Sequence, residues 1–383
     1  MRHLPIISLV VVSLLARPLC AQELEEMTPA SEVALERGLA WLAANQGPEG
    51  NWESKDLGLV SMGALAFMAA GNAPNRGKYG KQTAKALEYV IQHAKPSGLL
   101  NSQEAKRDMY NHGLSTFVLG QAQGMTSGND KRLNLALDRA LKLIANTQCE
   151  DGGWAYEARR SQHGNDLSLA VMQAKALRSA VDSGLEVPPE VIDLAIRSVR
   201  EHYSPNGDRN APESQQREMA GQFTYSKGGG GGTTAMAAAG VVCMQEFGQY
   251  DDWRILKSMD VVAETVKALP NPRDVKDDGA LPFDAYTLYY VGQALYQVNG
   301  QYWKESYPKL RDMIVRSQLN DVKKLEDKGS WHDRGVKGGG HVGGKPGSLY
   351  GTSVACFILA IPNRYLPILQ EGKIESFRKN QAK

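Results

Sequence analysis

Apolar and polar positions follow helical spacing in the stretch 136–154, which reads ALDRALKLIANTQCEDGGW. Leu137 and Leu141 fall on one face with other apolar residues, and charged residues occupy the opposite face, as in an amphipathic helix. The helix should end near Gln148, where a glycine-containing turn leads to Trp154. The stretch therefore predicts a unit of helix, glutamine, turn and tryptophan.

This unit occurs three times, with the longest turn in the third copy. In the first two copies the tryptophan follows the glutamine by six positions, and in all three copies a basic residue precedes the glutamine by nine. Such self-similarity is typical of repeated helix pairs. A glutamine at a helix end can bond the orphan carbonyls of that end or the amides of the next helix, and the tryptophan can pack over the same end. The three pairs are Gln46 with Trp52, Gln148 with Trp154, and Gln318 with Trp331.

Twelve helical segments follow from the same periodicity, and they form six pairs. The first member of each pair carries charges on one face, whereas the second is apolar nearly all round. A helix that is apolar on every side must be buried on every side. The pairs are 31–46 with 57–70, 81–94 with 110–123, 133–147 with 166–183, 189–202 with 233–247, 258–268 with 284–298, and 307–318 with 348–360.

We therefore predict an all-α fold, an (α/α)6 toroid of six inner and six outer helices in one domain over residues 22–383. An open α-solenoid is the alternative, but it would leave its apolar helices partly exposed to water. The repeated pattern of a basic residue, a small residue, an apolar pair, glutamine and Gly-x-Trp resembles the QW repeat of squalene-hopene cyclases and protein prenyltransferase β-subunits. This resemblance implies the same toroidal architecture and an aromatic cavity at its centre.

The chain departs from those families at their catalytic motifs. Class II terpene cyclases carry Asp-x-Asp-Asp, yet here the adjacent acids Asp251-Asp252 and Asp277-Asp278 stand in other contexts. Prenyltransferases hold zinc with an Asp-x-Cys pair and a histidine, and no Asp-x-Cys occurs. The thioester motif of complement-like toroids is also absent. We therefore expect no metal ion and no cofactor, and the sequence leaves open whether the chain is an enzyme at all.

The N-terminus is typical of an export signal. A basic pair is followed by an apolar run of eleven residues and a small-residue site, and the run is too short to span a bilayer. We predict a signal peptide over residues 1–21, an exported periplasmic or secreted protein, and no integral membrane segment afterwards. A lipoprotein anchored through Cys20 is the alternative. The other cysteines, Cys149, Cys243 and Cys356, are too few and too widely spaced for a disulfide framework.

Charge and loops narrow the choice of partner. The net charge is +2, from 44 basic and 42 acidic residues, which argues against a nucleic-acid surface. Long connections over 152–165, 203–232 and 329–347 are expected to be binding loops or lids. Their glycine clusters match no phosphate-binding loop and predict flexible or tightly turned segments. The expected partner is a small apolar ligand, a peptide or another protein.

Polar and aromatic side chains gather where the inner helices should begin, at one mouth of the toroid. His112, Asp166 and Asp284 are the candidates for acid or base chemistry, although aspartate is also an ordinary N-cap and a buried histidine is more often structural. Tyrosines could line the mouth or simply pack the core. The expected cavity-lining set is Tyr110, Tyr225, Tyr286, Tyr290 and Tyr350.

Several functions are compatible with these residues. A noncatalytic exported toroid that binds through its cavity or long loops is the interpretation that the sequence favours first. A divergent isoprenoid enzyme, either a terpenoid cyclase or a prenyltransferase, comes second. A carbohydrate-active (α/α)6 enzyme with paired carboxylates at the mouth comes third, and a structural repeat protein without a ligand comes last. The identity of the ligand, the oligomeric state and the ordering of the glycine loops stay open.

Overall fold

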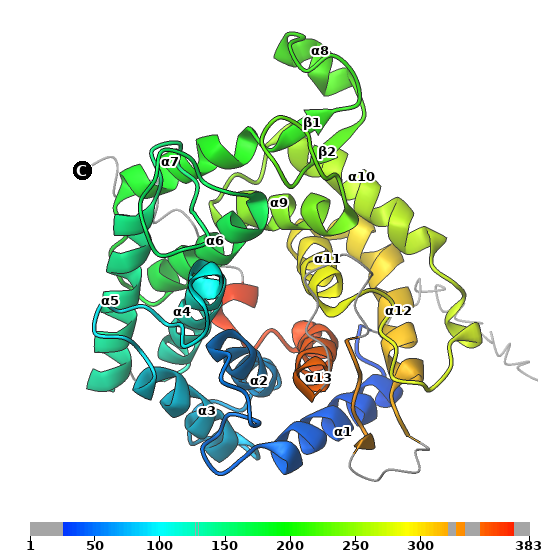
Figure 1. The fold of residues 1–383 in the computed structure, drawn as a ribbon. Helices are drawn as coiled ribbons and strands as arrows, with labels where there is room; N and C mark the ends of the chain where they lie inside the picture. The colour runs from blue at the N-terminus through cyan, green and yellow to red at the C-terminus, as the bar shows by residue number, and fades with distance from the viewer. Residues whose placement is uncertain (1–25, 127, 129, 321–326, 334–344, 371–383) are drawn as a thin grey trace, which may run out of the picture.

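The helices form a closed double ring (Figure 1). The computed structural model describes residues 26–126, 128, 130–320, 327–333 and 345–370. Each inner helix of this part of the chain contacts the next one, and the last contacts the first, so the ring has no open end. The predicted (α/α)6 toroid of six inner and six outer helices is confirmed, and the open solenoid is excluded. The predicted signal peptide, residues 1–21 with Cys20, lies outside the described residues.

The two rings alternate along the chain. The inner helices are α2 (Leu57–Ala69), α4 (Asp108–Gly124), α6 (Leu167–Asp182), α9 (Thr234–Glu246), α11 (Ala285–Val298) and α13 (Lys345–Ala360). The outer helices are α1 (Pro29–Asn45), α3 (Gly80–Gln92), α5 (Lys131–Thr147), α7 (Pro189–Arg200), α10 (Trp253–Ala268) and α12 (Gly300–Ser317).

Burial follows the predicted difference between the two kinds of helix. Every residue of α2 is buried, from Leu57 to Ala69, because its small apolar side chains meet neighbours on all sides. In α5, by contrast, the buried residues fall on a single stripe at helical spacing. Cys243 and Cys356 lie in inner helices and are buried free thiols, as is Cys149. The described part of the chain contains no helix that is long and apolar enough to cross a membrane.

The outer helices run head to tail around the ring, and the repeated glutamines close three of these junctions. Gln148 at the end of α5 donates to Gly152 O at 3.0 Å and to Val191 O, in the first turn of α7, at 2.9 Å. The indole of Trp154 donates to Ile144 O at 2.9 Å, so it covers the end of α5. The same three bonds recur at Gln46 with Trp52 and at Gln318 with Trp331, and the last set joins α12 to α1.

A glycine in each turn lets the next outer helix approach closely. Gly152 has φ +84°, and a Cβ there would lie 2.1 Å from Leu194 O of α7. Gly184 has a similar φ of +77°, yet nothing lies within 4 Å of its Cβ position. Gly152→Ala should therefore lower the free energy of unfolding by about 1–2 kcal/mol because of the left-handed backbone. The overlap of the new Cβ with Leu194 O should cost a further ~1–3 kcal/mol. Gly184→Ala should incur only the first of these losses.

Urea unfolding of the two alanine variants measures this difference in the free energy of unfolding. Equal losses at Gly152 and Gly184 would show that the close approach of α7 contributes nothing.

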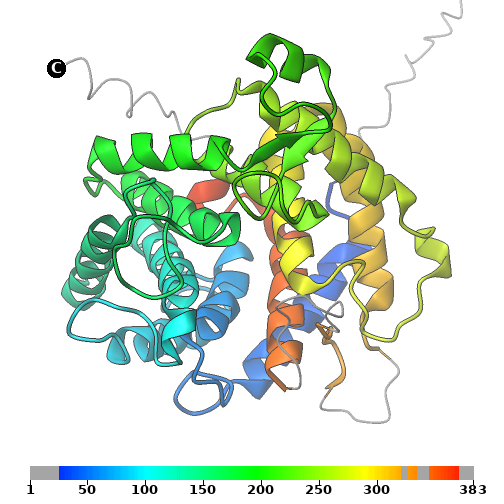
Figure 2. The same ribbon diagram turned by 45° about the horizontal axis from the view of Figure 1, so that its top comes forward.

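An excursion interrupts the ring between α7 and α9 (Figure 2). Strand β1 (Tyr203–Pro205) pairs antiparallel with β2 (Gly221–Phe223), and the short helix α8 (Glu213–Glu218) stands out between them. This segment was predicted only as a long loop. Two outer helices also begin earlier than predicted: α10 at Trp253 rather than 258, and α12 at Gly300 rather than 307.

Candidate active site at the mouth of the toroid

The inner helices begin at one mouth, and their first residues supply most of its polar groups. Aspartates cap three of these helices: Asp56 caps α2, Asp166 caps α6 and Asp284 caps α11. Each side chain accepts a hydrogen bond from a backbone N–H of the first turn, as an N-cap does. The candidate acids therefore have a structural role, and what distinguishes them is their remaining contacts.

Asp166 has the most enclosed carboxylate of the three, with 4% of the residue exposed. Its Oδ1 accepts from Ser168 N at 3.0 Å and Leu169 N at 3.3 Å, and also from the Ser168 hydroxyl. Its Oδ2 accepts from the hydroxyl of Tyr156. One oxygen thus holds the helix end, while the other faces the tyrosines of the mouth.

Three tyrosines surround that second oxygen. The Tyr156 hydroxyl also contacts the hydroxyl of Tyr225, and the Tyr110 hydroxyl contacts that of Ser168. Burial raises the pKa of Tyr110, and the negative charge of Asp166 raises it further. The pKa of Tyr156 is raised by burial first and then by its hydrogen bond to Asp166. These phenols are therefore neutral hydrogen-bond donors at physiological pH.

Two long loops carry this tyrosine cover. Tyr156 belongs to the α5–α6 connection and Tyr225 to the segment before α9. Leu167 N donates to Tyr225 O at 3.1 Å, and Lys227 Nζ lies 2.9 Å from Asp151 Oδ2. Tyr225 is 37% exposed, so its ring forms part of the outer surface of the mouth. The predicted binding loops 152–165 and 203–232 thus meet over Asp166.

The other side of the mouth is acidic and centres on Tyr350 of α13. Burial raises the pKa of Tyr350, and the charges of Asp333 and Asp284 raise it further, while Arg107 opposes them. Arg107 pairs with Asp56 at 3.2 Å. Asp284 Oδ2 accepts from Thr287 Oγ1 at 2.6 Å, and its side chain is only partly buried.

Tyr286 connects the two sides. Burial raises the pKa of its phenol, and the further causes include Tyr110, Tyr350 and Asp166, which lie in both halves of the mouth. The Tyr286 hydroxyl is buried and has no hydrogen-bond partner within 3.5 Å among the described residues. A polar ligand group that reached it would therefore satisfy a hydroxyl that otherwise carries a desolvation cost.

Two of the predicted site residues are not at the surface of the mouth. Tyr290 is fully buried, and its hydroxyl donates to Met172 Sδ at 3.2 Å, so it packs the centre of the ring rather than lining a cavity. His112 is also fully buried: its Nδ1 accepts from Leu100 N at 3.1 Å, and its Nε2 donates to Ala140 O at 3.0 Å. Burial lowers the pKa of His112 to about 4. Its candidate catalytic role is corrected to a structural one, because both ring nitrogens are engaged by backbone.

Residues that the sequence analysis did not single out complete the mouth. Tyr156 is the most important of them, because it is the contact between the loop cover and Asp166. The sequence feature that could have identified Tyr156 is its position as an aromatic residue inside a long predicted loop. Asp333 accepts from Ala285 N at 3.1 Å and fixes the start of α11, but its position after the long turn of the third unit gave no local pattern. Among the described residues no cluster of three or more histidine, cysteine or acidic side chains could hold a metal ion.

Comparison with known proteins gives the fold but no family. No family model matches the chain, and no curated protein matches it. Solved structures do match. The α-1,6-mannanase GH76A of Salegentibacter sp. HEL1_6 superposes with a TM-score of 0.54 at 9% identity, covering 86% of this chain and 98% of its own.

Two further matches carry ligands. An inactive GH76A variant, changed at two adjacent aspartates and bound to α-1,6-mannotriose, has a TM-score of 0.55 at 11% identity, over 86% of this chain and 99% of that one. The type II terpene cyclase MstE from Scytonema, as an arginine-to-alanine variant with geranylgeranyl dihydroxybenzoate, has a TM-score of 0.52 at 13% identity, over 87% and 98%. Identities this low show a shared toroid fold and no more.

These matches correct the order of the functional interpretations. The sequence favoured a noncatalytic binding toroid, and that choice is corrected, because the matched toroids of the same fold include α-1,6-mannanases. The likeness to terpene cyclases holds at the level of the fold, which both kinds of toroid share.

Proposed function

We propose that this chain is an exported carbohydrate-active enzyme that cleaves glycosidic bonds at the mouth of the toroid. The supporting observation is that Asp166 and Asp284 begin the inner helices α6 and α11 at one mouth, where Asp166 acts on Tyr286 and Asp284 acts on Tyr350. Glycosidases use two carboxyl groups that flank the scissile bond. The solved toroids with mannan oligosaccharides bound support the substrate class.

The surroundings of the two acids give them different roles. Donors on both oxygens hold the Asp166 side chain in one orientation, which suits a base or a nucleophile. Asp284 lies among other acids, Asp333 and Asp56, that act on the same tyrosine. Asp284 is also only partly buried, so its carboxyl group is the more accessible of the two and is assigned the general acid.

Tyrosines supply the binding surface. Sugars present hydroxyls at their edges and C–H groups on their faces, which match phenol hydroxyls and aromatic rings. Tyr110, Tyr156, Tyr225 and Tyr350 surround the two acids, and Tyr286 offers an unpaired hydroxyl between them. This combination fits a glycan better than an isoprenoid chain, because tyrosine hydroxyls and carboxylates can hydrogen-bond sugar hydroxyls, whereas an isoprenoid chain has no such groups.

The adjacent aspartates are weaker candidates. Inactive GH76A carries substitutions at two neighbouring aspartates, and this chain has two such pairs. Asp252 is 4% exposed in its side chain and is paired with Arg200 and Arg254. Asp277 and Asp278 are exposed on the loop before α11. Asp252 is thus held by its arginines, and Asp277 and Asp278 do not begin an inner helix as the two mouth acids do.

Replacement of one acid tests the proposal. Asp166→Asn keeps an N-cap side chain, so the fold should persist, but hydrolysis should fall at least about 100-fold because the carboxylate is lost. The assay measures reducing ends released from α-linked manno-oligosaccharides and from a panel of other neutral glycans. Asp130→Asn is the matched control, since Asp130 caps the outer helix α5 in the same way, away from the mouth.

Two results would contradict the proposal. The first is that the intact protein releases no reducing ends from any glycan in the panel. The second is that Asp166→Asn hydrolyses as fast as the intact protein and Asp130→Asn.

A further inference from the structure

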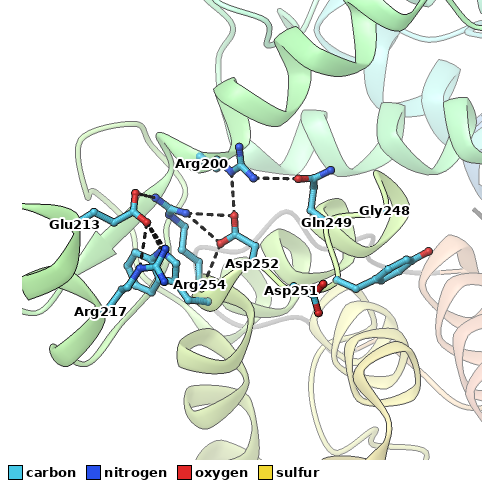
Figure 3. Close-up of a pocket in the computed structure, with 10 residues that line it drawn as sticks. Arg200, Glu213, Arg217, Gly248, Gln249, Asp251, Asp252 and Arg254 are labelled. Atoms are coloured by element: carbon cyan, nitrogen blue, oxygen red, sulfur yellow. Dashed lines mark hydrogen bonds and ion pairs between the residues drawn. The ribbon is translucent and has the colours of Figure 1, made fainter. Parts of the chain in front are cut away.

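A second polar site lies in the outer wall, where α7 ends and α10 begins (Figure 3). Its cavity holds about 400 Å³, which is in the usual range for small-molecule sites. Helix α8 of the excursion leans over one side of it, through Glu213 and Arg217. The cavity lies at the far end of α9 from Thr233, about 20 Å along that helix from the mouth, and no step of the proposed hydrolysis uses it.

The floor of the cavity is held rigidly by ion pairs. Asp252 accepts from Arg200 Nε at 2.9 Å and from Arg254 Nη1 at 3.1 Å, and only 4% of its side chain is exposed. Glu213 accepts from Arg217 Nη2 at 2.6 Å and from Trp253 Nε1 at 3.1 Å. Planar groups fixed in this way are prepared to bond further partners at little entropic cost.

The charges of the cavity balance. Three arginines line it, and so do three carboxylates, Glu213, Asp251 and Asp252. A site without net charge does not attract anions or cations from a distance. The ligand that fits is therefore neutral and rich in hydrogen-bonding groups.

Two lining residues lie outside the ion pairs of Asp252 and Glu213. Tyr250 is 48% exposed and its hydroxyl bonds Arg178, so the ring is anchored at its hydroxyl and open to solvent along the rest of its surface. The Asp251 carboxylate points away from the arginine cluster (Figure 3) and is exposed. A ring beside a carboxylate can hold the C–H face and a pair of hydroxyls of one sugar unit.

We propose that this cavity is a second carbohydrate-binding site, which holds a neutral stretch of a longer glycan while the mouth acts on another. Tyr250 and Asp251 contact the sugar, and the ion pairs of Asp252 and Glu213 keep the wall in shape. The inference rests on the proposed function only for the choice of ligand class, because the site itself is separate from the mouth.

Affinity electrophoresis tests this site independently of hydrolysis. The Asp166→Asn protein, which should leave the probe intact, is run in gels that contain α-mannan, dextran or, as an anionic comparison, dextran sulfate. At least one neutral polysaccharide should retard it. Tyr250→Ala and Asp251→Ala, each added to that protein, should weaken the affinity about tenfold. Tyr365→Ala is the matched control, since Tyr365 is 52% exposed and lines a different cavity.

The outcomes separate the two proposals. Retardation that Tyr250→Ala and Asp251→Ala remove and Tyr365→Ala leaves intact supports the second site, even if the intact protein hydrolyses nothing. Retardation unaffected by Tyr250→Ala and Asp251→Ala would overturn it, as would retardation by dextran sulfate alone or by none of the three polymers. If the intact protein hydrolyses glycans but gives one of these contradicting results, the proposal for the mouth stands and only the second site is refuted.

Discussion

Trp154→Ala should lower the free energy of unfolding by about 3–5 kcal/mol. The indole is 1% exposed, and it fills the space over the end of α5 while donating to Ile144 O at 2.9 Å. Alanine would leave a cavity, and Ile144 O would keep only the longer bond from the Thr147 hydroxyl, at 3.3 Å, at a helix end that already has orphan acceptors. Urea unfolding followed by far-ultraviolet circular dichroism measures the loss.

Two variants define the origin of that loss. Trp154→Phe keeps an aromatic ring but loses the N–H donor, so its loss should fall between that of Trp154→Ala and none. Tyr250→Ala removes an exposed ring and should stay within about 0.5 kcal/mol of the intact protein. If Trp154→Ala unfolded at the same urea concentration as Tyr250→Ala, the tryptophan would have no packing role at the junction.

The repeated junction could be predicted because all its determinants are local. Gln148, the turn glycine and Trp154 lie within seven residues, so their spacing is visible in the sequence, and the same bonds recur in the other two units. What the sequence did not show is the acceptor on the neighbouring helix. Val191 O is 43 residues away from Gln148, and only the head-to-tail packing of α5 and α7 brings it within reach.

Helix boundaries failed where a local rule competed with tertiary packing. Proline is typical of a first helical turn, yet Pro308 lies inside α12, which already begins at Gly300, seven residues before the predicted start at 307. The helix begins at Gly300 because Trp303 is buried, with its indole stacked on the phenol ring of Tyr307 at 3.9 Å between ring centroids. The excursion with α8 was missed because its strands are three residues each, too short to show alternation.

The mouth could be predicted only in part, for a related reason. Asp166 and Asp284 were visible as candidates because each precedes an apolar helix, which is a pattern in the chain. Their separation across the ring, and the role of Tyr156 as the cover of Asp166, depend on how two loops meet. For His112 the sequence left both a structural and a catalytic role open, since a histidine near a helix start looks the same in sequence whether it faces ligand or backbone.

Lys175→Met should lower the free energy of unfolding by about 3–5 kcal/mol, because it leaves Glu246 buried without its cation. Lys175 and Glu246 are 1% and 2% exposed in the middle of the ring, with Nζ and Oε1 3.4 Å apart. Burial lowers the pKa of Lys175, and Glu246 opposes that shift. Gln297 still donates to Glu246 Oε1 at 2.9 Å and the Arg178 guanidinium still attracts it, so the carboxylate keeps these two neighbours but loses the cation in direct contact with it. Urea unfolding at pH 7 gives the value.

A second substitution separates the pair from the packing around it. Lys175→Met with Glu246→Gln removes both charges, and the stability should recover most of the loss, because two neutral side chains of similar size need no counter-ion. Lys142→Met is the matched control at the surface, where the pair with Asp138 is 70% and 47% exposed and should contribute under 1 kcal/mol. If the double variant were as unstable as Lys175→Met, the lost stability would come from the packing of the lysine side chain and not from the unpaired charge. Lys175 Nζ lies 4.4 Å from the centroid of the Phe117 ring. Since α6 and α9 each supply one partner, recovery would also show that the ring closes without this ion pair.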